Sequence, residues 1–144
     1  MDAPHFCNVD LEIESRSDLS GLLAELGRKV IVLANGPKRK GFHSLRLETA
    51  MQYDNPDTTI CAFCSCLELL SQKSRRAWRA ANKKVFDVGY EIVTPQRITQ
   101  FSLRAKTLKR ISDLGGVIGV TIYNHHKVER KDRAKPVSTN RDRD

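Results

Sequence analysis

Three cysteines lie close together at Cys61, Cys64 and Cys66, and a fourth stands far from them at Cys7. Thiolates at such a spacing can ligate a metal or exchange disulfides. Structural zinc sites, however, usually draw their four ligands from two spaced pairs, and here a single CxxCxC segment lies inside a helical apolar pattern. A free cysteine on an apolar face behaves as a small hydrophobe. The spacing therefore favours core packing, with no metal and no cofactor; metal binding or redox chemistry is the alternative.

Histidine could act as a general base, but it needs a placed nucleophile or carboxylate beside it. The sequence pattern gives no such partner to His5 or His43. Residues 35–41 have the residue types of a phosphate loop without its GxxxxGK[ST] spacing, which favours a solvated basic loop. We therefore expect no catalytic residues and a protein that is not an enzyme. An enzyme that uses Cys64 or His43 is the alternative interpretation.

Carboxylates alternate with apolar residues along segments 7–14 and 86–92, a pattern typical of strands with one buried face. If these two strands are neighbours, one uncovered face of the sheet carries a row of acids. Such a row lacks the contrast of environments that acid–base catalysis needs. It is either a solvated surface or a docking surface for a basic partner. This acidic sheet face comprises Asp10, Glu12, Glu14, Asp87 and Glu91.

Lysines and arginines gather on two predicted helices, at 74–84 and 103–114. Like charges four residues apart on one helix cost roughly 0.2–0.5 kcal/mol per pair, a cost that an acidic surface or a nucleic-acid backbone would offset. An ordinary solvated face is the other interpretation, and the chain has no helix-turn-helix, zinc-finger or RNA-recognition signature for reading bases. The basic helical face comprises Arg75, Arg76, Arg79, Lys83, Arg104 and Lys109.

The 144 residues fit one domain, and the formal net charge of +8 raises the expectation of an acidic partner. The first residues do not have the basic start and apolar run of a secretory signal, and no apolar stretch is long enough to cross a membrane. Free thiols fit a reducing compartment, so we expect a cytoplasmic protein. Residues 1–124 are predicted to form the domain and 125–144 a disordered basic tail.

The apolar spacing predicts an α+β fold with helices behind a mostly antiparallel sheet, either ferredoxin-like or built from two strand–helix–strand units. A short extended stretch up to Ile98 is an additional candidate edge strand. Strands are expected at 7–14, 29–33, 45–49, 86–92 and 117–123, and helices at 19–26, 58–70, 74–84 and 103–114.

Two segments carry a resemblance to a known family. They are Phe86-Asp-Val-Gly-Tyr90 and the closing run Ile111-Ser-Asp-Leu-Gly-Gly-Val-Ile-Gly-Val-Thr-Ile-Tyr123. With the elements around them, they resemble the bacterial family known as domain of unknown function 4279, over roughly Phe6 to Asn124. That family has no agreed catalytic residues, so the resemblance transfers no chemistry to this chain. It implies a small stand-alone protein with an immunity or antitoxin role.

These observations together predict a non-enzymatic binding or regulatory domain that engages a macromolecular partner. A basic protein would bind the acidic sheet face, and electrostatic steering would speed its association. The alternative is sequence-independent nucleic-acid binding through the basic helices and the tail, whose affinity would fall steeply with salt. The oligomeric state is left open.

Overall fold

Alternation of apolar and polar residues builds the central strand β1 (His5–Ser15). Its side chains at Val9, Leu11 and Ile13 are completely buried. Because successive side chains of a strand point to opposite faces of the sheet, the residues between them lie on the other face.

The computed structural model describes residues 5–92 and 100–124. The extended stretch up to Ile98 and the tail at 125–144 lie outside this described part.

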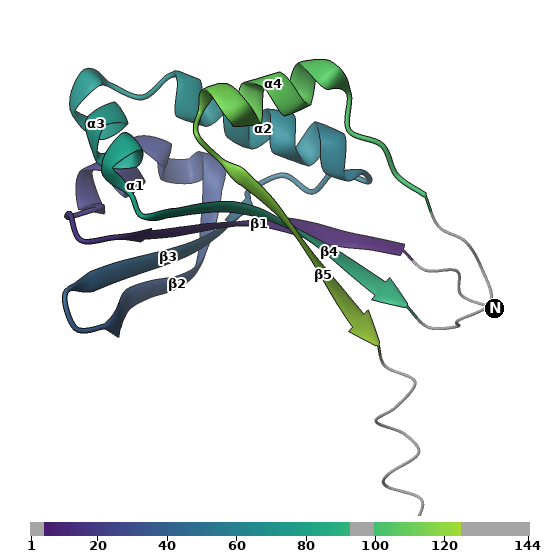
Figure 1. The fold of residues 1–144 in the computed structure, drawn as a ribbon, viewed down its shortest axis with the longest axis horizontal. Coiled ribbons are helices and arrows are strands. Elements are labelled where there is room, and N and C mark those ends of the chain that lie inside the picture. The colour runs from purple at the N-terminus through teal and green to yellow at the C-terminus, as the bar shows by residue number, and fades with distance from the viewer. Residues whose placement is uncertain (1–4, 93–99, 125–144) are drawn as a thin grey trace, which may run out of the picture.

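Within residues 5–92 and 100–124 the chain forms five strands, four α-helices and one short 3-10 helix (Figure 1). In chain order after β1 these are α1 (Ser20–Leu26), η1 (Gly27–Lys29), β2 (Val30–Arg39), β3 (Phe42–Thr49), α2 (Pro56–Glu68), α3 (Gln72–Ala80), β4 (Lys83–Ile92), α4 (Ala105–Asp113) and β5 (Val117–Asn124).

The strands form one sheet in the order β2-β3-β1-β4-β5. All neighbours are antiparallel except β4 and β5, which are parallel. The first four strands follow the split β-α-β-β-α-β arrangement of ferredoxin-like folds, and α4 adds β5 to the edge beside β4. The predicted α+β class is therefore confirmed. The two strand–helix–strand units differ, because β3 separates β1 from β2 whereas β4 and β5 pair directly.

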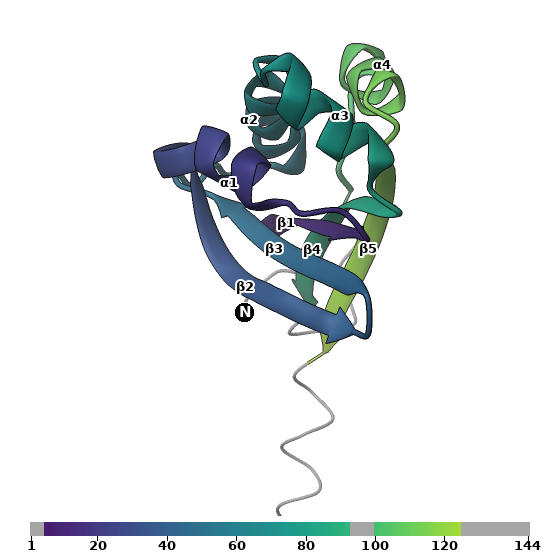
Figure 2. The same cartoon turned by 90° about the vertical axis from the view of Figure 1, so that its left-hand side faces the viewer.

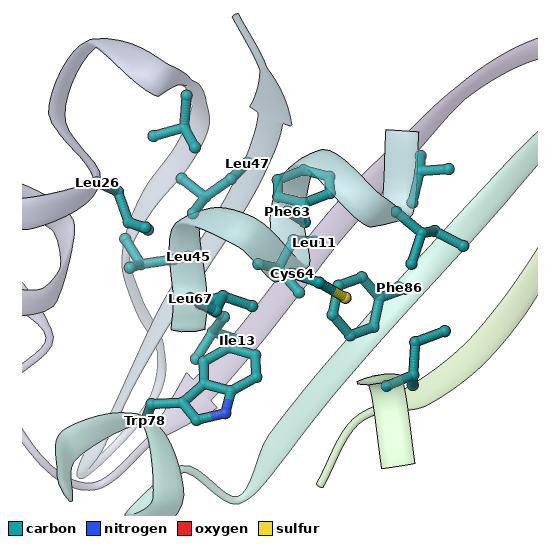
Figure 3. Close-up of a cluster of buried hydrophobic side chains, with 14 of the residues drawn as sticks. Leu11, Ile13, Leu26, Leu45, Leu47, Phe63, Cys64, Leu67, Trp78 and Phe86 are labelled. Atoms are coloured by element: carbon teal, nitrogen blue, oxygen red, sulfur yellow. The ribbon is translucent and has the colours of Figure 1, made fainter. Parts of the chain in front are cut away.

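The helices all lie on one face of the sheet (Figures 1 and 2). Between the two layers is an apolar core in which Phe63 and Cys64 of α2 pack against Leu11 and Phe86 of the sheet (Figure 3). Each large apolar side chain buried in this way stabilises the fold by about 1.5–3 kcal/mol. Among the described residues, no helix has the length and apolarity needed to cross a membrane.

The segment 35–41, expected to be a loop, forms part of a hairpin. β2 continues through it to Arg39, and β3 begins at Phe42. The turn between them contains Gly41 with φ of 81°, a left-handed conformation that glycine adopts without strain. Pairing with β3 thus overrides the turn-forming composition of this segment. The short turn joins β2 and β3 as antiparallel neighbours.

Candidate functional site

The sheet face opposite the helices carries all five predicted carboxylates. β1 and β4 are neighbours, and Asp10 lies directly opposite Asp87 in their register. Glu12 and Glu14 follow on the same face of β1, because they alternate with the buried residues of that strand. Glu91 lies on the same face of β4, near its end. The two-strand geometry expected from the alternation is therefore present.

Three cations share this face with the acids. Arg46 Nε of β3 is 2.9 Å from Asp10 Oδ2 and 4.0 Å from Glu12 Oε1. Lys83 Nζ is 2.8 Å from Glu12 Oε2, and Arg39 Nη2 is 3.5 Å from Glu14 Oε1. The surface is therefore not a uniform acidic row, because Asp10, Glu12 and Glu14 each have one of these cations as a neighbour.

Carboxylates still outnumber cations in a small recess on this face, which we call the acidic recess. Three carboxylates meet there from three adjacent strands: Asp10 of β1, Glu48 of β3 and Asp87 of β4. Its volume is about 180 Å³. The other residues that line it are Cys7, Asn8, Gly89 and Tyr123.

Gly89 of β4 lines the acidic recess next to Tyr123. A Cβ atom at Gly89 would lie 3.4 Å from the carbonyl oxygen of Asn8 and 3.5 Å from Cε2 of Tyr123. Both separations are ordinary van der Waals contacts, so the Tyr123 ring of β5 packs closely on β4 at this position. Strand β5 also fixes the side chain of Asp87. The hydroxyl of Thr121 on β5 lies 2.8 Å from both carboxylate oxygens of Asp87 and donates to them.

The surroundings of Asp10 in the acidic recess shift the pKa of its carboxyl group. Burial raises the pKa of its carboxyl group, and the neighbouring charges of Glu48 and Asp87 raise it further. The guanidinium of Arg46 lowers the pKa of Asp10 but offsets only part of this effect. The folded protein therefore opposes the ionisation of Asp10. A further positive charge in the recess would favour the ionised form.

The cysteines do not come together as one cluster. Cys64 is buried in the core, and burial raises the pKa of its thiol to about 11, which keeps the thiol neutral. Cys61 Sγ lies 3.3 Å from the Thr107 hydroxyl of α4, while Cys66 is on a different face of α2. Cys7 belongs to the sheet, where burial and the charge of Glu91 raise its pKa. Within the described residues, no group of three potential ligands is placed to hold a metal.

The prediction that Lys83 belongs to the basic helical face is wrong. Helix α3 ends at Ala80, and Lys83 is the first residue of β4, with its ammonium group on the opposite side of the sheet at Glu12. The physical reason is strand pairing: the N–H of Asn82 already donates to the carbonyl of Glu14, which starts the ladder with β1.

The remaining cations of that set are divided between two helices and partly neutralised. At the N-cap of α4, Arg104 Nε is 3.0 Å from Asp57 Oδ2, and within α4 Lys109 Nζ is 2.8 Å from Asp113 Oδ2. Arg75 of α3 donates to the carbonyl of Glu68. Arg76 and Arg79 are exposed on α3.

Sequence reasoning missed Arg46, Glu48 and Tyr123. The alternation of Arg46 and Glu48 with Leu45 and Leu47 shows which face of β3 they occupy, but not that β3 lies beside β1. Comparison with protein-family models, curated proteins and solved structures found no match. Membership of the family that the sequence resembles therefore stays a prediction.

Proposed function

We propose that this chain is a non-enzymatic binding domain whose acidic recess accepts a lysine or arginine side chain from a basic protein. The observation that carries the proposal is the convergence of Asp10, Glu48 and Asp87 around one hollow of about 180 Å³. Arg46 is in contact with only one of the three carboxylates, Asp10. A cation of a partner would supply the missing positive charge.

The electrostatics of Asp10 support this proposal. Its side chain is 17% exposed, so the carboxylate is partly desolvated yet open to an incoming group. An ammonium or guanidinium group in the acidic recess would form charge-assisted hydrogen bonds there, which are about twice as strong as neutral ones. The recess would also steer a basic partner toward the sheet and so raise the association rate.

The family resemblance supports one biological setting, the inhibition of a basic toxin by a small immunity-type protein. A toxin that handles nucleic acid is usually basic, and carboxylates could mask it. We also propose a reducing cytoplasmic location, which is supported by the free thiols of all four cysteines.

The test compares the wild-type chain with a triple variant, Asp10→Asn/Glu48→Gln/Asp87→Asn, which removes the charge but preserves the shape of the recess. Both are used for affinity capture from native cell extract with mass spectrometry, and for association kinetics with an oligo-arginine peptide. We expect the variant to lose the basic protein and to associate with the peptide at least about tenfold more slowly at low salt.

A matched control removes three exposed acids elsewhere, through Asp18→Asn, Asp54→Asn and Asp113→Asn. This control should retain the partner and most of the association rate. Equal losses in the two triple variants would show that only net charge matters and would contradict the proposal. Capture of nucleic acid in place of a basic protein would favour the basic helices instead.

A further inference from the structure

A second hollow lies on the helical side of the molecule, and its residues take no part in the acidic recess. It is a groove of about 500 Å³ between the outer side of α2 and the wall formed by η1 and the loop after β3. One side is lined by Ala62, Ser65 and Cys66 of α2 and by its C-cap residue Leu69, whose spacing places them on one face of the helix. The opposite wall comprises Arg28, Lys29, Thr49, Ala50, Met51 and Tyr53.

Hydrogen bonds hold the wall opposite α2 in place. The N–H of Ala50 donates to the carbonyl of Lys29 at 2.9 Å, which ties the loop to η1. The hydroxyl of Thr49 donates to the carbonyl of Met51 at 2.7 Å and fixes the start of the loop. These hydrogen bonds fix the backbone of this wall, and the backbone in turn defines this side of the groove.

The groove is apolar and open to solvent. Met51 is 68% exposed and Leu69 is 75% exposed, which makes them the most exposed large hydrophobic residues in the described part of the chain. Two exposed apolar side chains beside one groove offer apolar surface that a partner can cover. A small-molecule pocket typically buries 70–90% of its ligand, whereas walls this exposed can cover only one side of an occupant. The groove is therefore suited to a peptide segment.

The charge of the lining selects the chemistry of that segment. Arg28 and Lys29 are the charged residues of the groove, and both are exposed. The lining contains no carboxylate to compensate them. We infer that the groove binds an acidic amphipathic helix of a partner protein, with the apolar side chains of that helix against Leu69 and Met51 and its carboxylates toward Arg28 and Lys29. This is helix-in-groove recognition, with a charge preference opposite to that of the acidic recess.

The probe is a labelled synthetic peptide of about 15 residues, long enough to be helical. It carries leucines at positions i, i+3 or i+4, and i+7, with glutamates elsewhere. One matched peptide has lysine in place of glutamate, and another has serine in place of leucine. Titration of the full-length chain, followed by fluorescence anisotropy, should show that the glutamate peptide binds at least about tenfold more tightly than either.

The groove contains its own reporter in Cys66. The glutamate peptide should slow alkylation of the Cys66 thiol and leave alkylation of Cys7, which is exposed on the sheet, unchanged. This readout uses the unmodified protein, so it does not depend on any variant folding correctly. Equal protection of both cysteines, or protection of neither, would overturn the assignment.

Variants locate the binding surface. Leu69→Ser and the pair Arg28→Glu/Lys29→Glu should each weaken binding of the glutamate peptide about tenfold. The matched controls are Leu108→Ser, at a leucine of α4 that is 45% exposed, and Arg76→Glu/Lys106→Glu, at exposed cations outside the groove. Equal losses in controls and test variants would overturn the proposal. Equal affinity for the three peptides, or binding of none of them, would also overturn the proposal. So would binding of the fatty-acid anion dodecanoate by a chain that binds none of the peptides.

Discussion

Asp10 is the residue through which pH acts most directly on the acidic recess. An acid whose pKa is raised on folding adds stability at low pH, and this contribution is lost as the pH rises through its folded-state pKa. Burial and the charges of Glu48 and Asp87 place Asp10 in this class. We therefore expect Asp10→Asn, which stays neutral, to gain stability relative to wild type as the pH rises from below the unfolded-state aspartate pKa of about 4 toward neutral. Denaturant unfolding of both proteins across this range measures the difference.

Asp18 provides a control of opposite sign for this prediction. Hydrogen bonds from the backbone N–H and the hydroxyl of Ser20 lower the pKa of Asp18. Its contribution to stability is therefore present above the unfolded-state pKa and is lost as the pH falls. Asp18→Asn should lose stability relative to wild type as the pH rises. A flat or falling difference for Asp10→Asn would show that the recess does not oppose ionisation.

The same residues show how far local pattern predicts a site. The period-2 alternation gives the face of Asp10 and Asp87 correctly, because a strand allows only two directions for a side chain. It does not predict that Arg46 neutralises part of that face or that Glu48 completes the recess. Those contacts depend on β3 lying beside β1, which is a long-range pairing.

At the scale of elements, Asp57 connects α2 to the start of α4. Its carboxylate accepts hydrogen bonds at 3.0 Å from the N–H and the guanidinium of Arg104. Burial alone would raise the pKa of Asp57, but the hydrogen bonds from Arg104 and Thr107 outweigh it and lower the pKa. Asp57→Asn should therefore cost about 2 kcal/mol of unfolding free energy at neutral pH.

This difference should shrink as the pH falls below about 4, because protonation of Asp57 removes the same charge in wild type. Amide hydrogen exchange should locate the loss of protection in α4. Asp113→Asn is the control: its ion pair with Lys109 lies within α4 and is exposed, so its removal should have a smaller effect. An equal effect of the two variants would contradict a docking role for Asp57.

Element boundaries were predicted less well than element order. The helix expected at 74–84 ends at Ala80, although Lys83 and Lys84 favour helices. Pairing of Lys83 with Glu14 and of Lys84 with Ile13 draws this segment into β4. Such pairing stabilises a strand through a partner about 70 residues away in the chain, so no local signal reveals it.

At the scale of the whole molecule, the net charge of +8 describes the surface poorly. Several cations of the helical side are already engaged: Arg110 Nε is 2.9 Å from Glu68 Oε1, and Lys109 contacts Asp113. A phosphate backbone would have to displace these carboxylates before it could bind the cations. Binding of a phosphate to the exposed cations Arg76 and Arg79 of α3 requires no such displacement. If duplex DNA binds this side, we therefore expect it to gain from Arg76 and Arg79 of α3 but little from Lys109 and Arg110 of α4.

The dependence of DNA affinity on salt separates these two groups of cations, because each phosphate contact changes the slope of log K against log salt by about 0.9. Replacing Arg76 and Arg79 with alanine should reduce the slope by about 2. Replacing Lys109 and Arg110 should leave it within about 1 of the wild-type slope, since their partners Asp113 and Glu68 already neutralise them. Each pair removes two formal charges from the full chain, so net charge alone predicts equal reductions. Equal reductions would mean that the internal ion pairs open on binding, and would contradict this division of the cations.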